Sequence, residues 1–275
     1  MEWLLILKAI LMGLVEGVTE FLPISSTGHL IILGDLIDFL DKGRRDVFEV
    51  AIQLGAILAI CWEYRARLIG VVQRLPSDPK ARGFVLNLLI AFLPAAVMGV
   101  IFISAIKSLL FYPVPVACAL LIGGFVILWL EKREHVIRVH SVDDMTAMDA
   151  FKIGCAQCLA LIPGTSRSGA TIMGGLFFGF SRTTAAEFSF FLAIPTMFAA
   201  TFYDILKHRE LFEPSDFGLM AIGFIAAFIS ALLVVRALMK FIANHSFIAF
   251  AFYRIGLGIL LLGLSFTGVV NFSAA

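Results

Sequence analysis

Long apolar runs separated by short polar segments make up almost the whole chain, and the length of these runs predicts helices that cross a membrane. A transmembrane helix needs about twenty apolar residues, and six uninterrupted runs come close to that length. The predicted spans cover residues 47–64, 84–106, 114–130, 183–206, 217–241 and 247–269. The pattern therefore predicts an all-α polytopic membrane protein with six full transmembrane helices.

Two further apolar regions, residues 4–40 and 147–180, are each broken near the middle by a polar stretch. The first elbow is Pro-Ile-Ser-Ser-Thr-Gly at residues 23–28, and the second elbow is Pro-Gly-Thr-Ser-Arg-Ser-Gly at residues 163–169. Non-helical backbone at membrane depth is tolerated only where it lines a cavity or is enclosed by protein. Each region is therefore predicted to be a re-entrant helical hairpin, and both elbows are candidates for the functional site.

The two broken regions resemble each other, which indicates an internal repeat within a single membrane domain of residues 1–275. If Gly13 is aligned with Gly154, the elbows match as well. The aligned pairs are Ser25 with Ser166, Thr27 with Ser168, and Gly28 with Gly169. The halves, approximately residues 1–131 and 147–275, would each hold one hairpin and three spans. Because three full spans is an odd number, the second half is predicted to be inverted in the membrane relative to the first, with a shared site near mid-depth.

Composition supports the membrane assignment, since 60% of the residues are hydrophobic and 15% are charged. The formal net charge of +1 offers no basic surface of the kind that binds nucleic acid. The cysteines all lie in apolar segments, so a disulfide framework is not expected.

The positive charges of the loops predict the orientation in the membrane. With both hairpins re-entrant, twelve lysines and arginines fall on one side and six on the other. The larger group is Arg65, Arg67, Arg74, Lys80, Arg82, Lys132, Arg133, Arg138, Lys152, Arg182, Arg236 and Lys240; the smaller is Lys42, Arg44, Arg45, Lys107, Lys207 and Arg209. The side with the twelve basic residues is predicted to be cytoplasmic, so the first elbow would open toward the outer, periplasmic face.

The first broken region carries the densest group of reactive side chains. Glu16 and Glu20 lie four residues apart, so a helix would place both carboxylates on one face, where a cation or a basic partner is needed. The alternative is a pair of helix-end glutamates that reach the membrane surface. His29 has the pKa range of a proton carrier. Ser26 lies three residues before His29, within hydrogen-bonding reach on a helix, whereas Ser25 is rotated away.

The second elbow has the composition of an anion cradle. Arg167 can hold phosphate oxygens through two parallel hydrogen bonds, and hydroxyl side chains surround it. The candidate substrate-binding residues are Arg167, Ser25, Thr27, Thr165, Ser166, Ser168 and Thr171. An arginine that only pairs structurally with Glu16 or Glu20 is the alternative.

Four segments together resemble the bacterial undecaprenyl-diphosphate phosphatases of the bacitracin-resistance type. They are EGVTEFLPISSTGH, FEVAIQLGAILA, LIPGTSRSGAT and EFSFFLAIP, and the resemblance extends over essentially the whole chain. It implies hydrolysis of undecaprenyl diphosphate in the bacterial plasma membrane, which recycles the lipid carrier for peptidoglycan synthesis. The family's motif glutamates correspond to Glu16 and Glu20, its serine pair to Ser25 and Ser26, its histidine to His29 and its arginine to Arg167.

These residues suit phosphoryl transfer, which needs charge neutralisation and an in-line nucleophile. Glu16 and Glu20 are expected to hold a divalent cation, Mg²⁺ by preference with Ca²⁺ as an alternative. Ser26 is the preferred nucleophile, with His29 and Glu20 as catalytic partners; Ser25 and a metal-bound water remain alternatives. A transporter is the rival class, because inverted repeats with broken helices are common in transporters. A homodimer is a further expectation.

Overall fold

Helices form nearly all of the secondary structure in the computed structural model, which describes residues 3–110, 112–134, 136–208, 210 and 216–266. Within these ranges there are eleven α-helices and two 3-10 helices, and no strand longer than the isolated bridge between Val139 and Phe180. The predicted all-α class is confirmed. The helices are α1 Trp3–Thr19, α2 Ser26–Leu36, α3 Lys42–Glu63, α4 Arg65–Arg74, α5 Pro79–Leu110, α6 Pro113–Lys132, η1 Val142–Asp144, α7 Ala147–Gln157, η2 Cys158–Leu161, α8 Arg167–Phe177, α9 Arg182–His208, α10 Phe217–Ile242 and α11 Ile248–Phe266.

Five of the described helices, α5, α6, α9, α10 and α11, are long and apolar enough to cross a membrane. Five of the predicted spans coincide with them, although the last three residues of 247–269 reach beyond Phe266, into the part of the chain that is not described. The predicted span 47–64 lies on α3 and its C-cap, Tyr64. The α3 helix meets the same criterion only together with α4, from which it is bent by 70°. The chain is thus a multi-pass membrane protein, and the described residues hold five candidate spans, or six if the bent pair is one span.

Both predicted interruptions are present. The first apolar region is split between α1 and α2, and the second between α7 with η2 and α8. Helices α2, α7 and α8 have 11 residues each, which is about 16 Å of helix. That is about half of a hydrocarbon core, so none of the three can cross it alone.

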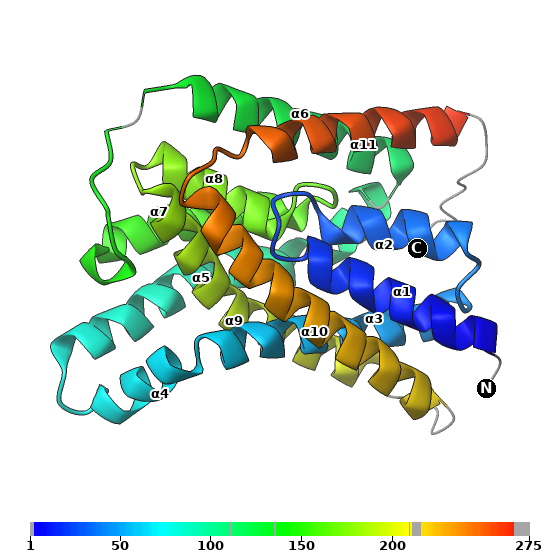
Figure 1. Cartoon of the computed structure of the whole chain (residues 1–275), viewed down its shortest axis with the longest axis horizontal. Helices are drawn as coiled ribbons and strands as arrows, with labels where there is room; N and C mark the ends of the chain where they lie inside the picture. Colours follow the sequence, from blue (N-terminus) through cyan, green and yellow to red (C-terminus); the bar gives the residue numbers. More distant parts are fainter. Residues whose placement is uncertain (1–2, 111, 135, 209, 211–215, 267–275) are drawn as a thin grey trace.

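The broken helices pack closely against full spans. In Figure 1, α6 lies along α11, while α1 packs on α10, which in turn packs on α3. On the other side of the molecule α7 packs on α5, and α8 on α9. A Cβ atom on Gly13 of α1 would lie 2.3 Å from the Gly223 carbonyl oxygen, and one on Gly154 of α7 would lie 2.6 Å from that of Ala91. Both contacts bring two helix backbones together where only glycine leaves room, as is common in membrane bundles.

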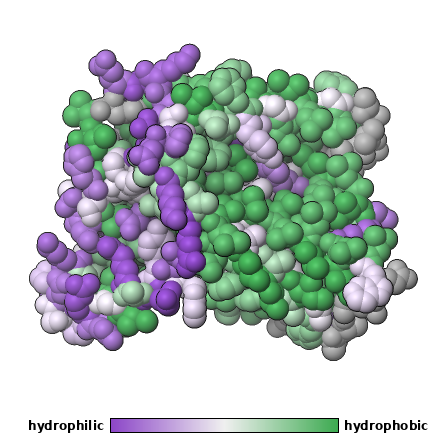
Figure 2. Space-filling view, in the orientation of Figure 1, coloured by the Kyte–Doolittle hydropathy of each residue, from purple (hydrophilic) through white to green (hydrophobic). Residues whose placement is uncertain are grey.

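The surface divides into a polar end and an apolar remainder. Figure 2 shows hydrophilic side chains gathered at the left, the end where α4 lies and α5 begins, and apolar side chains over most of the rest of this face. Such a division is expected for a protein that presents one end to water and its flank to lipid. The four cysteines are free thiols, as predicted.

Candidate active site

The two half-helices α2 and α8 begin in the same unusual way. Each is preceded by a serine with a left-handed backbone, Ser25 with φ 71° and Ser166 with φ 72°, a conformation that side-chain-bearing residues rarely adopt. Each serine Oγ accepts a hydrogen bond from the backbone N–H three residues later, at 3.4 Å from Gly28 and 3.0 Å from Gly169. This N-capping compensates part of the strain. It also leaves neighbouring N–H groups at both helix starts available to an anion.

The beginnings of α2 and α8 line one cavity of about 190 Å³. Ser25, Ser26 and Thr27 contribute from the first elbow, and Ser166 and Arg167 contribute from the second. Glu20, which lies directly after α1, also faces this space. The structure therefore brings these six predicted residues together at one cavity, between the two elbows.

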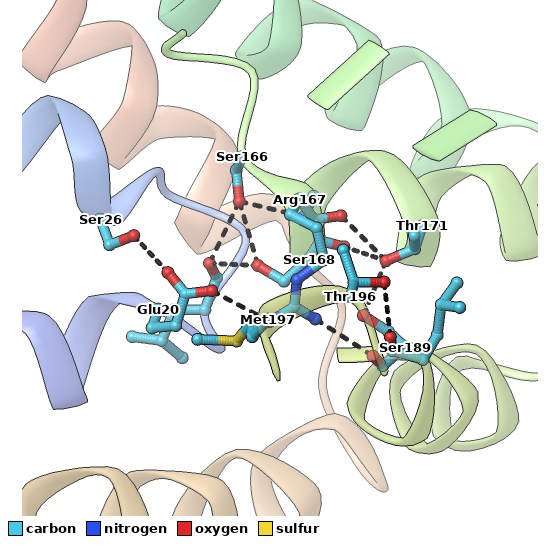
Figure 3. A network of polar contacts seen from close by, with 12 residues as sticks. Glu20, Ser26, Ser166, Arg167, Ser168, Thr171, Ser189, Thr196 and Met197 are labelled. Carbon is cyan, nitrogen blue, oxygen red and sulfur yellow. Dashed lines mark hydrogen bonds and ion pairs between the residues drawn. The ribbon is translucent and has the colours of Figure 1, made fainter. Parts of the chain in front are cut away.

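A chain of polar contacts crosses the cavity from one elbow to the other (Figure 3). The Ser26 hydroxyl donates a hydrogen bond to Glu20 Oε2, while Arg167 Nη2 donates to Glu20 Oε1 at 3.0 Å. Both side chains of the ion pair are 12% exposed. A carboxylate in hydrogen-bonding contact with a hydroxyl is placed to accept its proton. The adjacent guanidinium balances the negative charge that desolvation would otherwise disfavour.

Other contacts fix the Arg167 guanidinium and join the elbows. Arg167 Nη1 donates to the Ser189 carbonyl oxygen at 3.1 Å. The Ser168 hydroxyl donates to the carbonyl oxygen of Leu22 at 2.8 Å, and the Ser166 and Ser168 hydroxyls lie 3.0 Å apart. The second elbow is thereby hydrogen-bonded to the backbone of the first.

Glu16 lies one turn before Glu20, and its surroundings differ. Its side chain is fully buried, and neither carboxylate oxygen has a hydrogen-bond partner among the described residues. An unpaired buried carboxylate is costly, which fits a cation at this position. No three His, Cys, Asp or Glu side chains of the described ranges converge on a possible metal site. Two glutamates would therefore supply part of a coordination sphere, as is usual where Mg²⁺ also binds water and phosphate.

His29 does not make the hydrogen bond to Ser26 that helical spacing predicted. Its Nδ1 lies 2.7 Å from the Ser25 carbonyl oxygen, and its Nε2 lies 2.6 Å from the Tyr253 hydroxyl. Both ring nitrogens are thus engaged, while the Ser26 hydroxyl is bound to Glu20. The expectation was wrong because the imidazole ring lies between the Ser25 carbonyl oxygen, one helical turn earlier, and the Tyr253 hydroxyl of α11. The group that contacts Ser26 is Glu20.

The remaining predicted substrate-binding residues fall into two groups. Ser25, Thr27 and Ser166 line the cavity, as described above. Thr165, Ser168 and Thr171 are not among its lining residues. Thr171 Oγ1 lies 2.7 Å from Ser189 Oγ and donates to the Arg167 carbonyl oxygen at 2.9 Å, so this side chain contacts α9 and its own helix.

Arg254 of α11 was missed in the sequence, although it is the largest fully buried side chain among the residues that the structure describes. It donates hydrogen bonds to five backbone carbonyl oxygens that come from both elbows and from α6. The acceptors are Pro23 at 3.1 Å, Gly164 at 3.0 Å, Thr165 at 2.8 Å, Ala119 at 3.1 Å and Leu120 at 3.4 Å. An isolated charge inside an apolar span is a functional signal in membrane proteins, and this signal could have identified it.

Polar side chains from two spans also line the cavity without having been predicted. They are Gln53 of α3 and Thr196 of α9, and Met197 lies beside them. The Thr196 hydroxyl donates to Gln157 Oε1 at 3.4 Å, and Arg167 Nη2 lies 3.4 Å from the Met197 sulfur. Single polar residues in a span give little signal because many pair with their own helix backbone, as Thr196 also does.

Taken together, the fold and the site define a multi-pass helical membrane protein whose polar centre, made of serine, glutamate and arginine, lies at two interrupted helices. A family model for the bacitracin resistance protein BacA matches residues 9–260. The chain belongs to this family. It is 61% identical to "Undecaprenyl-diphosphatase 2" of Rhodospirillum rubrum, with 100% of both chains covered. It is also 60% identical to the "Undecaprenyl-diphosphatase" of Nitrosomonas europaea, with 99% of each chain covered.

Proposed function

We propose that this chain hydrolyses undecaprenyl diphosphate to undecaprenyl phosphate and inorganic phosphate in the bacterial plasma membrane. The reaction recycles the lipid carrier for peptidoglycan synthesis and confers bacitracin resistance. The names of relatives about 60% identical over their full length support this activity. The observation that carries it is the contact series from Ser26 through Glu20 to Arg167, set between two helix N-termini that line one cavity.

In the reaction, Ser26 Oγ attacks the terminal phosphorus and its proton passes to Glu20 Oε2. The bond from phosphorus to the bridging oxygen breaks, and undecaprenyl phosphate leaves. Glu20 passes the proton that it took from Ser26 to the departing undecaprenyl phosphate. Water then attacks the phosphoserine, Glu20 accepts a proton from the water and returns it to Ser26 Oγ as the bond between phosphorus and Oγ breaks, and inorganic phosphate is released. Arg167 and the free N–H groups of α2 and α8 hold the phosphate oxygens as charge shifts between them. Ser25 is the weaker nucleophile candidate, because its hydroxyl caps α2.

A divalent cation, preferably Mg²⁺, would be held by Glu16 and Glu20 and would neutralise diphosphate charge when bound. The support is the unpaired carboxylate of Glu16. Glu20 contributes less to such a clamp, since both of its oxygens already accept hydrogen bonds. His29 serves as a positioning residue that ties the start of α2 to Tyr253.

The inverted repeat is supported by two features that aligned residues share. Ser25 and Ser166, which align in sequence, share φ and capping. The aligned Gly13 and Gly154 each approach a backbone carbonyl of the middle long helix of the opposite half, α10 for Gly13 and α5 for Gly154. Two halves that exchange equivalent contacts in this way are expected of a duplicated domain whose hairpins are re-entrant.

The proposed activity is tested by release of inorganic phosphate from a prenyl diphosphate by the purified chain in detergent. A transporter, the rival reading of the same architecture, needs two compartments and would release none. Absence of release under conditions where the protein stays folded would contradict the phosphatase assignment. Homodimer formation remains a prediction, which crosslinking between copies in native membranes would test.

Replacing Glu16 by glutamine is expected to abolish metal-dependent phosphate release, because the amide keeps the shape of the side chain and removes the charge that binds a cation. A chelator should reduce the wild-type rate to the same level, and added Mg²⁺ should restore the wild type alone. Titration calorimetry with Mg²⁺ provides a second measurement that is independent of turnover. Full activity of Glu16→Gln, or wild-type activity in excess chelator, would exclude the metal role.

The periplasmic opening of the site predicts which loops a membrane-impermeant thiol reagent reaches. In a chain whose four cysteines are replaced by alanine, a cysteine at Gly43, at the start of α3, should be labelled in intact cells. A cysteine at Ser77, between α4 and α5, should be labelled only after the cells are opened. The opposite pattern would place the first elbow's opening in the cytoplasm and reverse the predicted orientation.

A further inference from the structure

A second cavity, larger than the first, lies at the far end of α8. Its volume is about 380 Å³, and its lining includes three cations and two aromatic rings, from the end of α6, the segment after it, α7 and α8. We call it the basic pocket; the lining residues used below are Arg133, Glu134, Arg138, Lys152, Phe177 and Phe178. Phe177 follows Arg167 by ten positions along α8, so the basic pocket lies about 15 Å from the active-site arginine.

Two of the cations are held in place without being neutralised. The Arg133 guanidinium carbon lies 5.5 Å from the ring centroid of Phe177 and 5.7 Å from that of Trp129, and Lys152 Nζ lies 5.5 Å from Phe178. Cation–π contact orients a charge and leaves it available to an anion. Within the described residues, neither Arg133 nor Lys152 forms an ion pair with a carboxylate.

The carboxylates around the pocket do not cancel its charge. Arg138 pairs with Asp149 at 2.5 Å, and Glu134 adds one further carboxylate to the lining without an ion pair among the described residues. Three cations therefore face two carboxylates. The net positive charge suits a ligand that is itself an anion.

The wall of the basic pocket is fixed to the end of α8 through the backbone. The Gly179 carbonyl oxygen accepts hydrogen bonds from the N–H groups of Arg138 at 2.8 Å and Val139 at 3.2 Å. Gly179 has φ 83°, and a Cβ there would lie 2.9 Å from the Val136 carbonyl oxygen. The cavity is thus a built feature of the fold, bounded by hydrogen-bonded main chain.

The surroundings place the pocket at the level of lipid headgroups. Arg133 follows the last residue of α6, one of the candidate spans, so it stands where that span leaves the membrane. Exposed apolar side chains adjoin the cations: Val136 is 87% exposed, and Trp129 and Phe177 are also exposed. Cations next to exposed aromatic and apolar side chains are typical of the membrane surface, where a basic pocket binds anionic lipid headgroups.

We propose that the basic pocket binds the phosphate-bearing headgroup of an anionic phospholipid. Arg133 and Lys152 contact the phosphate, and the acyl chains lie against Trp129 and Phe177. A free phosphate ion would use the same two cations. It would gain nothing from the apolar rim, which is why a lipid is the better-matched ligand.

The test uses Trp129 as a reporter of the lipid beside it. Of the three tryptophans, Trp3 and Trp62 are replaced by phenylalanine, and the full chain is placed in phosphatidylcholine vesicles. Phosphatidylglycerol with brominated acyl chains is expected to quench Trp129 at a mole fraction roughly thirtyfold lower than brominated phosphatidylcholine does, given the usual gain for two basic side chains at a membrane surface. In Arg133→Gln/Lys152→Gln this preference should fall to near one.

A matched control separates the pocket from general surface charge. Lys80→Gln/Arg82→Gln also removes one lysine and one arginine, both exposed on the first turns of α5, and should keep the full lipid preference. Phosphate release by all variants reports folding, and the single variant Lys152→Gln replaces the double variant if that one is misfolded. The proposal is overturned by equal loss in the control, by absence of lipid preference in the wild type, or by displacement of the lipid by millimolar inorganic phosphate.

Discussion

Replacing Ser26 by alanine is expected to lower turnover about a thousandfold or more, because it removes the cavity-lining hydroxyl that donates a hydrogen bond to the Glu20 carboxylate. Ser25→Ala should lose far less turnover and chiefly stability, about 1 kcal/mol, since it removes the cap of α2. The measurement is turnover of both purified variants on a short-chain prenyl diphosphate, with binding followed separately. If Ser26→Ala kept near-normal turnover while Ser25→Ala were inactive, the nucleophile would be Ser25.

A double variant tests whether Glu20 acts through Ser26. If Glu20 only takes the Ser26 proton, Glu20→Gln/Ser26→Ala should be no slower than the slower single variant, since residues that act as a unit have non-additive effects. If the loss of turnover in the double variant is the product of the losses in the two single variants, Glu20 also acts elsewhere, for example by binding a metal ion together with Glu16. Activity in both serine single variants would exclude serine attack and leave a metal-bound water as the nucleophile.

The elbows and their chemistry could be predicted from the sequence because membrane depth restricts what the chain can do there. Proline, glycine and hydroxyl residues inside an apolar run leave backbone groups that only a protein-lined cavity can satisfy. The same restriction made Glu16, Glu20 and Arg167 stand out as ionisable groups that need partners. Five spans followed from run length alone, whereas the bend between α3 and α4 did not, since no proline or glycine marks it at Tyr64.

What the sequence could not supply was the direction of individual side chains. Helical spacing correctly put Ser26 and His29 near each other along α2, but the rotamer of His29 carries its ring to Tyr253, more than two hundred residues away in the chain. Ser26 instead meets Glu20, which stands after the end of α1, where periodicity no longer applies. Contacts between helices far apart in the chain depend on how those helices pack, and local spacing carries no information about that packing.

Arg254 is the clearest example of a residue whose contacts the sequence could not reveal. Its replacement is the second substitution from which we expect a large effect. Its guanidinium holds the carbonyl oxygens of Pro23, Gly164 and Thr165 in one place, so it fixes the first elbow relative to the second. Methionine at this position would leave five buried carbonyl groups without that donor. Arg254→Met should therefore lower the stability of the folded chain by about 3 kcal/mol or more and lower turnover per folded molecule roughly a hundredfold, since an ångström of misplacement costs about that much.

Two glycine variants at the contact between α6 and α11 show whether Arg254→Met acts by lowering stability or by misplacing the elbows. A Cβ on Gly123 would lie 2.1 Å from Arg254 Nη2, so Gly123→Ala displaces the guanidinium while retaining it, and its turnover should also fall. A Cβ on Gly258 would lie 2.9 Å from Leu121 Cγ of the same α6–α11 contact and touches neither elbow. Gly258→Ala should lower the melting temperature and leave turnover per folded molecule unchanged at a temperature where all variants are folded. If Arg254→Met and Gly258→Ala lose turnover only in proportion to unfolding, Arg254 has a structural role alone. A fall in kcat that is confined to Arg254→Met and Gly123→Ala shows instead that the hydrogen bonds from Arg254 to both elbows set the geometry in which Ser26 faces Arg167.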